Sequence, residues 1–394
     1  MKKALVVVVI AAIVLCFVPI PASAENGVTD SQIVVGMSTV LTGPASFLGT
    51  SFKAGAEAYL QDVNAKGGVN GRKIKLIAYD DGYEPGKAVP NVTKLINVDK
   101  VFCLLGNVGT PTTMAIKPII TREKVPLFAP FTGAEPLRRP VVKYILNYRA
   151  SYDQEVEEFI RGMVDVLGRR KVGVFFQDDA YGRVVLEATK TALEKRGLAP
   201  VATGMYKRNT EDIGEGLSAV MAGKPDAVVM VGTYAACGKF IIQGKKQGFN
   251  PVYMNVSFVG PDKLAEIVGK SGDGEVVTSV VPPFYGDAAQ NYAGVQQYLD
   301  ATKRHFPGTK PNFVGLEGFL ATKVFVEGLR RAGKGLTRES FITAVEGIKD
   351  FDIGAGNTIS FSEDNHQGSQ KVYPTVIRNG RYQLIKDWAA VKEQ

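Results

Sequence analysis

The sequence predicts an α/β protein with two similar parallel sheets, each covered by helices. The chain has 394 residues, more than the roughly 100–200 residues of an ordinary domain. Short runs of β-branched residues alternate with segments of helical periodicity, as they do in parallel sheets joined by helices. This alternation stops near Asn147 and then begins again, so we expect two units of the same kind.

The first 24 residues have the pattern of an export signal. Two lysines precede an apolar run over 4–18, and small residues stand just before the predicted cleavage site after Ala24. The apolar run is shorter than the roughly 20 residues that a membrane-spanning helix needs. We therefore expect a soluble mature protein in the periplasm. A lipid anchor on Cys16, which lies inside the apolar run, is an open alternative.

The first unit is predicted to alternate strands with amphipathic helices. The helix over 51–65 is the clearest, because its apolar residues recur with the spacing of one buried helical face. Gly67 and Gly68 end it, as glycines often do at helix C-termini. The predicted strands are 33–37, 73–79, 101–105 and 126–128, and the second predicted helix is about 110–122.

The second unit repeats this alternation and adds a C-terminal hairpin. Residues 288–347 are predicted to be largely helical, and 371–385 to form a hairpin that turns at Asn379 and Gly380. The remaining predicted elements are the helices 153–167, 181–196, 212–222 and 234–247 and the strands 171–177, 201–206, 227–231 and 252–256.

The composition argues against several classes of protein. The formal charge is +8, but the basic residues are scattered and are not interleaved with aromatic residues, so we expect no nucleic-acid partner. His305 at a surface-like helix end and His366 in a polar loop are not near a nucleophile. The glycines at 354–356 lack the strand and helix that frame a dinucleotide site. We expect no metal, no cofactor and no enzyme activity.

Two of the cysteines, Cys103 and Cys237, lie outside the predicted signal. Cys103 falls in an apolar strand of the first unit and Cys237 in a helix of the second. A disulfide between them would prevent the two units from moving relative to each other. We therefore expect two buried free thiols.

Two loops of the first unit are candidate binding segments, because ligands of open parallel sheets bind at the carboxyl ends of the strands. At Thr110 a helix begins directly after a strand, and its backbone N–H groups and threonine hydroxyls suit a carboxylate. An ordinary helix start with Pro111 in the first turn is an equal alternative. In the second loop, Phe131 offers an aromatic wall and Thr132 a hydroxyl, with a plain loop as the alternative.

The second unit contributes aromatic and acidic candidates. Tyr181 and Tyr234 each begin a helix after a strand, where an aromatic side chain can face a cleft. Asp178 and Asp179 are candidates for paired acids or metal ligands. An N-cap role for one of them is the better interpretation, because adjacent loop residues point in different directions.

Several motifs together resemble one family. The sequence NAKGGVNG at 64–71 precedes a strand that ends in the pair Asp80 and Asp81, and 130–134, 178–182 and 224–227 add further matches. The chain resembles the substrate-binding proteins of branched-chain amino-acid-type ABC transporters, the leucine/isoleucine/valine-binding family. The resemblance covers essentially the whole mature chain.

The resemblance implies the type I periplasmic-binding-protein fold, with two Rossmann-like lobes joined by three hinge crossovers. Lobe 1 would comprise 27–147 and 281–352, and lobe 2 would comprise 148–280 and 353–394. The implied function is the capture of a small, partly apolar carboxylate by lobe closure and its delivery, by a monomer, to ABC permease subunits. A soluble sensory domain that feeds a separate receptor is the alternative, and an exported enzyme that uses Asp178 and Asp179 is another.

The resemblance also implies a set of ligand-binding residues. Family members that bind amino acids carry an acid at the position of Ser257, where it neutralises the ligand ammonium. Asp178, Asp179 or Glu317 would have to replace it. The expected ligand is a branched-chain or other hydrophobic amino acid, or a carboxylate without an amine, such as an aromatic or branched oxo acid. The implied site residues are Phe47, Leu48, Thr110, Phe131, Thr132, Tyr181, Tyr234, Ser257 and Phe313.

Overall fold

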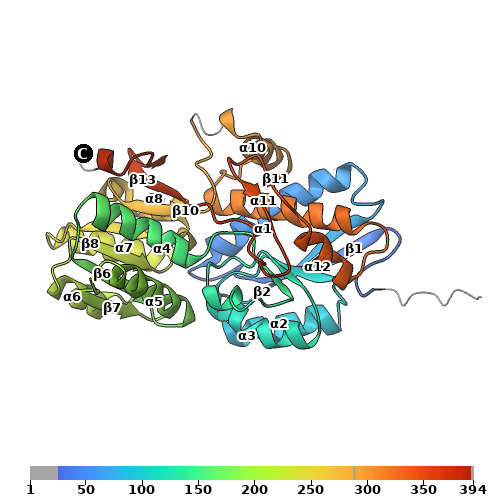
Figure 1. The fold of residues 1–394 in the computed structure, drawn as a ribbon, viewed down its shortest axis with the longest axis horizontal. Helices are drawn as coiled ribbons and strands as arrows, with labels where there is room; N and C mark the ends of the chain where they lie inside the picture. The colour runs from blue at the N-terminus through green and yellow to red at the C-terminus, as the bar shows by residue number, and fades with distance from the viewer. Residues whose placement is uncertain (1–24, 287–289, 392–394) are drawn as a thin grey trace, which may run out of the picture.

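The computed structural model describes residues 25–286 and 290–391. Two sheets lie side by side, each packed between helices (Figure 1), which confirms the predicted α/β class. The predicted signal peptide, its cleavage site and Cys16 lie outside the described residues. Within the described part of the chain, no helix has both the length and the apolar character needed to cross a membrane.

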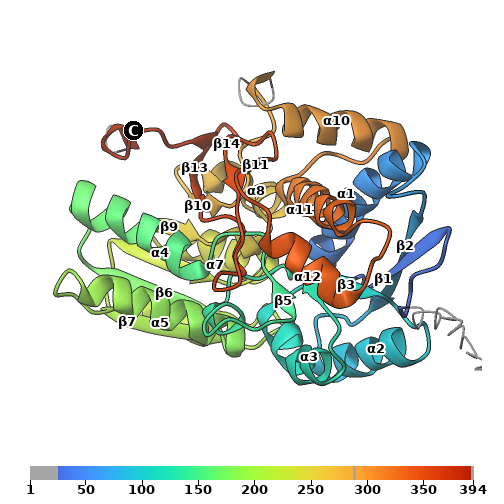
Figure 2. The same cartoon turned by 45° about the vertical axis from the view of Figure 1, so that its right-hand side comes forward.

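The first sheet is entirely parallel and has the strand order β2-β1-β3-β4-β5. Helices α2 and α3 lie on one side of it, and α1 and α11 lie on the other (Figure 2). The short strand β5 was not predicted. The strands are β1 Gln32–Thr39, β2 Lys73–Asp80, β3 Cys103–Leu105, β4 Leu127–Phe128 and β5 Ile145–Leu146.

The second sheet has the order β14-β13-β10-β9-β8-β6-β7, parallel from β7 to β10 and antiparallel at β13 and β14. Strands β6 and β8 are buried at every position, as expected when helices cover both faces of a parallel sheet. Asn379 and Gly380 have positive φ in the predicted hairpin turn. The strands are β6 Val172–Gln177, β7 Ala202–Tyr206, β8 Ala227–Val231, β9 Val252–Asn255, β10 Val276–Ser279, β13 Tyr373–Arg378 and β14 Arg381–Leu384.

The predicted helices are present, most of them with shifted ends, while α2 and α8 were not predicted. The predicted helix 153–167 is α-helical only to Ile160 and continues as a π-helical segment, Arg161–Val166, in which Gly162 packs against the indole of Trp388. The helices are α1 Ser46–Ala65, α2 Pro85–Asn97, α3 Thr110–Arg122, α4 Tyr152–Ile160, α5 Ala180–Glu194, α6 Gly214–Ala222, α7 Tyr234–Lys246, α8 Pro261–Val268, α10 Ala293–His305, α11 Phe313–Ala332 and α12 Arg338–Glu346.

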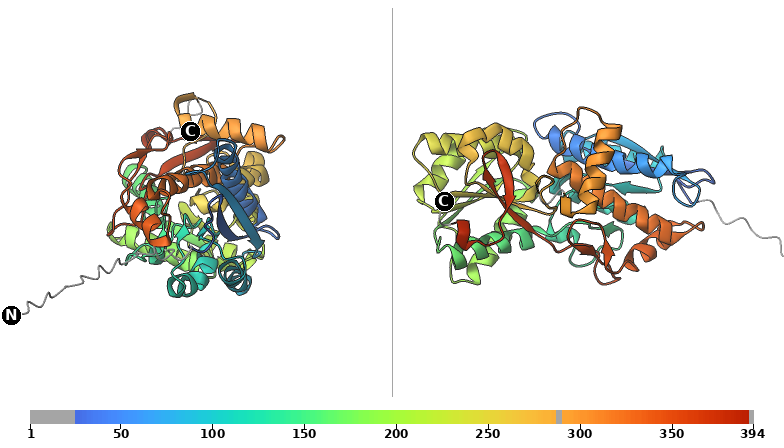
Figure 3. Two further views of the ribbon diagram at one scale, coloured as in Figure 1. Left: turned by 90° about the vertical axis from the view of Figure 1, so that its right-hand side faces the viewer. Right: turned by 90° about the horizontal axis from the view of Figure 1, so that it is seen from above.

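Three connections run between the two sheets (Figure 3): the first follows β5, the second follows β10 and the third precedes β13. The first and the third lie side by side: the Asn147 amide donates to the His366 carbonyl at 2.7 Å, and the Gly368 amide donates to the Asn147 carbonyl at 2.8 Å. The second follows β10, which pairs with β13 just after the third connection. Because the three connections lie close together, they can bend at the same point, as a hinge between two lobes requires.

The position of the third crossover bears on the lobe boundaries. A small sheet of β11 Phe351–Asp352 and β12 Thr358–Ile359 precedes it. Beyond this sheet, the ring of Phe361 lies 6.3 Å from that of Phe128 in β4. The predicted boundary between 352 and 353 stays a prediction, and this contact favours a boundary nearer to β13.

His366 is buried, although its surroundings were predicted to be a polar loop. Its ring nitrogens contact the Ile145 carbonyl at 3.1 Å and the Glu346 carboxylate at 2.9 Å. The reason is the parallel run of the first and third connections, which covers this segment. Cys103 and Cys237 are buried free thiols, as predicted.

Candidate functional site

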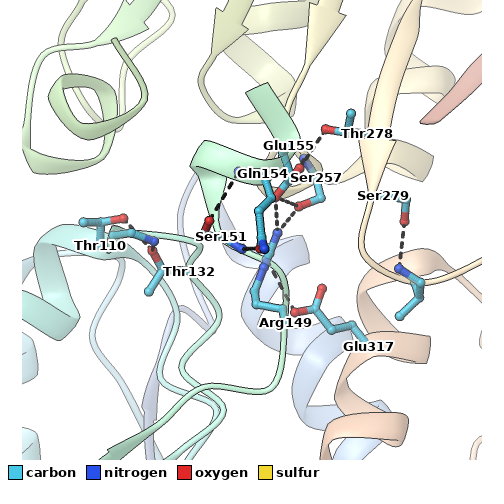
Figure 4. Close-up of polar contacts among 12 residues, drawn as sticks. Thr110, Thr132, Arg149, Ser151, Gln154, Glu155, Ser257, Thr278, Ser279 and Glu317 are labelled. Atoms are coloured by element: carbon cyan, nitrogen blue, oxygen red, sulfur yellow. Dashed lines mark hydrogen bonds and ion pairs between the residues drawn. The ribbon is translucent and has the colours of Figure 1, made fainter. Parts of the chain in front are cut away.

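Two threonine hydroxyls meet where the loops after β3 and β4 come together. A parallel bridge joins Val108 to Phe131, and the hydroxyl oxygens of Thr110 and Thr132 lie 2.7 Å apart (Figure 4). Both side chains are buried. One hydroxyl donates to the other, so the pair still holds one O–H donor for a third group.

Thr112 and Thr113, the other two threonines in the first turn of α3, differ in their hydrogen bonds. The hydroxyl of Thr112 donates to the carbonyls of Val108 and Gly109, so its proton is already used by the backbone at the start of α3. The hydroxyl of Thr113 is buried and has no hydrogen-bond partner among the residues that the structure describes. Of the predicted hydroxyls, those of Thr110, Thr113 and Thr132 remain for a ligand.

Arg138 holds the second of these loops in place. Its guanidinium donates to the carbonyls of Ala134 at 3.0 Å, Thr132 at 3.1 Å and Arg149 at 3.3 Å. Burial and the nearby positive charge of Arg149 lower the pKa of Arg138 to about 10. Arg138 remains charged at neutral pH, and its bonds to backbone carbonyls fix the position of Thr132.

An aromatic cluster spans the boundary between the two sheets. The ring of Phe258, which follows β9 of the second sheet, lies 5.4 Å from Phe131, 5.9 Å from Tyr83 and 4.7 Å from Tyr181. Tyr152 lies 5.4 Å from Tyr181. Burial raises the pKa of Tyr181 well above its usual value, and its hydroxyl finds no hydrogen-bond partner in the described ranges. The Tyr152 hydroxyl likewise has no hydrogen-bond partner in these ranges, so the cluster offers apolar contact and two unpaired hydroxyls.

A buried arginine lies beside the aromatic cluster, on the first connection between the sheets. The guanidinium carbon of Arg149 is 5.2 Å from the ring centre of Phe131 and 5.8 Å from that of Tyr152, distances at which cation–π attraction operates. The side chain is 1% exposed. Burial alone would lower the pKa of Arg149, but Glu317 and Glu155 raise it above its usual value.

Glu155 of α4 anchors this arginine. Its Oε1 accepts from Arg149 Nη2 at 2.8 Å and from the Ser257 hydroxyl at 2.9 Å. Its Oε2 accepts from the Ser257 amide at 2.7 Å and the Thr278 hydroxyl at 2.8 Å. Arg149 Nη2 also donates to the Ser257 hydroxyl. Figure 4 shows these bonds converging on one buried carboxylate.

Glu317 of α11 approaches the same arginine from the first sheet's side. Its Oε1 lies 3.4 Å from Arg149 Nη1. Burial raises the pKa of Glu317 to about 7, against the opposing attraction of Arg149. Glu317, Ser257 and Phe313 surround a narrow gap that is too small to hold a water molecule, with Phe131 on its wall.

The predicted residues Phe47, Leu48 and Tyr234 lie together at a second contact between the lobes. The Tyr234 hydroxyl accepts from the Phe47 amide at 3.3 Å, and the two rings meet edge to face at 5.9 Å. Gly260, which has positive φ, fits between these side chains, since a Cβ there would lie 2.8 Å from Leu48 Cδ2. Phe47 and Leu48 belong to α1, and Tyr234 begins α7.

Phe313 marks a third contact. Its amide donates to the Asp262 carboxylate of α8 at 2.7 Å, and its ring lies 5.7 Å from that of Tyr382. Burial raises the pKa of Asp262 to about 7, and the bond from the Phe313 amide opposes this rise. The nine predicted site residues therefore lie along the boundary between the sheets, with Phe47, Leu48 and Tyr234 in one group and the other six near the aromatic cluster, where Phe313 shares a space with Phe131 and Ser257.

The acid pair at 178–179 is used structurally. Asp179 is the N-cap of α5 and accepts from the Tyr181 amide at 2.9 Å, as predicted for one of the two. Asp178 pairs with Arg183 at 2.5 Å. Within 25–286 and 290–391, no group of three or more His, Cys, Asp or Glu side chains could hold a metal ion.

The sequence reasoning missed Arg149, Glu155, Phe258, Tyr83 and Tyr152. The one hint in the sequence was that related amino-acid-binding proteins carry an acid at the position of Ser257. The structure places an acid in contact with Ser257, but this acid is Glu155, from a helix more than 100 positions earlier in the chain, and it is already paired with an arginine.

Comparisons with known proteins agree with the fold. A family model described as "Periplasmic binding protein" matches residues 32–381. The solved structure of a possible leucine/isoleucine/valine-binding protein from Rhodopirellula baltica SH 1 is 34% identical, with a TM-score of 0.87, and the match covers 94% of this chain and 100% of that one.

Two curated relatives are more distant in sequence. Leu/Ile/Val-binding protein homolog 7 of Brucella abortus is 24% identical over 390 residues, 95% of this chain and 94% of that protein. An amino acid binding protein of Pseudomonas aeruginosa is 26% identical over 239 residues, 61% of this chain and 64% of that protein.

These findings confirm the predicted type I periplasmic-binding-protein fold. Members of the matched family are solute-binding proteins rather than enzymes, and the homologues imply export to the periplasm. The chain belongs to the branched-chain amino-acid binding family of the periplasmic binding proteins and has a substrate-binding role.

Proposed function

We propose that this protein captures a small, partly apolar carboxylate between its two lobes and delivers it to the membrane subunits of an ABC importer. The observation that carries the proposal is the buried Thr110–Thr132 hydroxyl pair next to an aromatic cluster built from both lobes. Export with cleavage after Ala24, the monomeric state and the absence of catalysis are parts of the same proposal.

The hydroxyl pair supports the binding of an anionic head group. It lies at the N-terminal end of α3, where backbone dipoles favour negative charge. The guanidinium of Arg138 donates to the Thr132 carbonyl, and its positive charge favours an anion near Thr132. The rings of Phe131, Tyr181 and Phe258 supply the apolar contact that the rest of the solute needs.

Contacts between the lobes support capture by closure. The Gln177 amide donates to the Tyr83 hydroxyl at 3.1 Å, and Arg208 pairs with Glu84 at 2.7 Å. A solute that contacts both lobes stabilises the closed arrangement over the open one, because it makes those contacts only when the lobes are together.

The proposal is tested by measuring binding to a panel of aliphatic and aromatic carboxylic acids, 2-oxo acids and amino acids. A ligand at 100 times its Kd adds about 2.7 kcal/mol to the free energy of unfolding, which a thermal-shift assay detects. Calorimetry then gives the Kd. A purified protein that binds no member of the panel contradicts the proposed carboxylate function.

The same assay tests the site. Thr132→Val removes the hydroxyl with little change of shape, and we expect it to weaken binding about tenfold. Thr203→Val on the exposed part of β7 is the matched control and should bind like the wild type. Equal Kd values for the two variants would place the carboxylate elsewhere.

A further inference from the structure

We propose that Arg149 occupies, as part of the protein, the position that a ligand ammonium takes in an amino-acid site, so that this site selects acids without an α-amino group. The inference deepens the proposed function and rests on it. It names the substrate class as 2-oxo acids and related amine-free acids with an acceptor oxygen next to the carboxylate.

The first step is the position of the guanidinium. Arg149 packs over Phe131, the residue before Thr132, and its backbone carbonyl shares the Arg138 guanidinium with the Thr132 carbonyl. The positive charge therefore lies over the ring of the residue that precedes Thr132. A ligand held by Thr132 would present its 2-position substituent close to this charge.

The second step is the state of Glu155. A carboxylate accepts about four hydrogen bonds, and those of Glu155 come from Arg149, the Ser257 hydroxyl, the Ser257 amide and Thr278. No acceptor site is left for a ligand ammonium. The acid that contacts Ser257 is thus present, but its charge is already neutralised.

The third step concerns the N–H groups of Arg149 that make no hydrogen bond within the described part of the chain. Its Nε and Nη1 groups are buried and lack a hydrogen-bond partner among the residues described. Nη1 lies 3.4 Å from a Glu317 carboxylate oxygen, which is longer than an ordinary hydrogen bond. Buried unpaired donors favour a ligand that brings an acceptor.

Together these steps separate two kinds of ligand. An oxo acid brings a carbonyl oxygen that can accept from the arginine. An amino acid brings an ammonium, which is repelled by the guanidinium and finds Glu155 saturated. The difference between the two ligands is confined to the substituent at the 2-position.

The experiment measures Kd by calorimetry for pairs of acids that differ only at that position. The pairs are 4-methyl-2-oxopentanoate with leucine, and phenylpyruvate with phenylalanine. For the wild-type protein we expect the oxo acid of the preferred pair to bind about tenfold or more tightly than its amino acid.

Arg149→Met is expected to reverse this preference, because it frees Glu155 to accept an ammonium. Removing one partner of a buried ion pair can destabilise the fold, so the double variant Arg149→Met/Glu155→Gln provides a second route. It carries neither charge, and we expect its two Kd values to become nearly equal. Arg183→Met, at a side chain that is 67% exposed, is the matched control and should keep the wild-type ratio.

The outcomes are distinguishable from those of the proposed function. Tight binding of leucine or phenylalanine by the wild type, with weak binding of the oxo acids, overturns the inference and leaves carboxylate capture intact. A folded double variant that keeps the wild-type ratio also overturns it. Failure of every acid in both series contradicts the proposed function itself.

Discussion

The buried acid Glu317 should make the protein less stable as the pH rises. In the folded chain its pKa is raised by burial to about 7, from an ordinary value of 4.5. Between these two values the folded state holds a proton that the unfolded state has lost, so the free energy of unfolding falls with increasing pH. The loss begins near the unfolded pKa and is complete above the folded one.

The size of the effect follows from the shift. A difference of one pKa unit corresponds to about 1.4 kcal/mol, so the shift of Glu317 corresponds to about 3 kcal/mol of lost stability at pH 8 relative to pH 4. Glu317→Gln keeps the volume and removes the charge. It should therefore be more stable than the wild type at pH 8 by up to about 3 kcal/mol and close to it at acidic pH.

Urea denaturation at pH 5 and pH 8 checks this. Asp262 also has a pKa raised to about 7 by burial, so the wild-type protein alone cannot isolate Glu317, and the comparison must be made between wild type and variant. Glu194→Gln, at an exposed position of α5, is the control. The reasoning is refuted if the difference between wild type and Glu317→Gln is the same at both pH values.

Two further predictions concern the contacts that shape the cleft. Gly133→Ala should lower the melting temperature, by a destabilisation of about 1–3 kcal/mol, because the new Cβ would lie 2.6 Å from Tyr152 Cδ1; Gly335→Ala, which meets nothing within 4 Å, should not lower it. Glu84→Gln and Arg208→Gln should each weaken solute binding, since the pair joins the lobes across 2.7 Å, and a double-mutant cycle should give a coupling of about 0.5–1 kcal/mol. A coupling of zero would show that this ion pair does not contribute to closure.

The parts of the fold that could be predicted are those encoded locally. The α3 helix has the predicted bounds, and Asn379 and Gly380 form the predicted turn, because helical periodicity and turn chemistry are properties of neighbouring residues. Strand β5 has only two residues, too few to show a period. Its pairing with β4 depends on a contact that no local pattern encodes.

The same distinction applies to the candidate site. Thr110 and Thr132 follow successive strands that lie side by side in the sheet, and the rule that strand ends converge was enough to bring them together. Phe258 was missed because its partners Tyr83, Phe131 and Tyr181 come from distant parts of the chain. Its position depends on how the two lobes meet, which the sequence does not express locally.

The departure at Ser257 shows why a single position cannot decide the class of ligand. Read alone, the loss of an acid there predicts a site that cannot hold an ammonium. The structure supplies a carboxylate at the same place from Glu155, which by itself would reverse that conclusion. Arg149, however, forms an ion pair with this carboxylate. The site is therefore again one that cannot hold an ammonium. Because an ammonium needs an acceptor that is both present and unpaired, the charge partner of Glu155, rather than the identity of residue 257, governs which acids the site can accept.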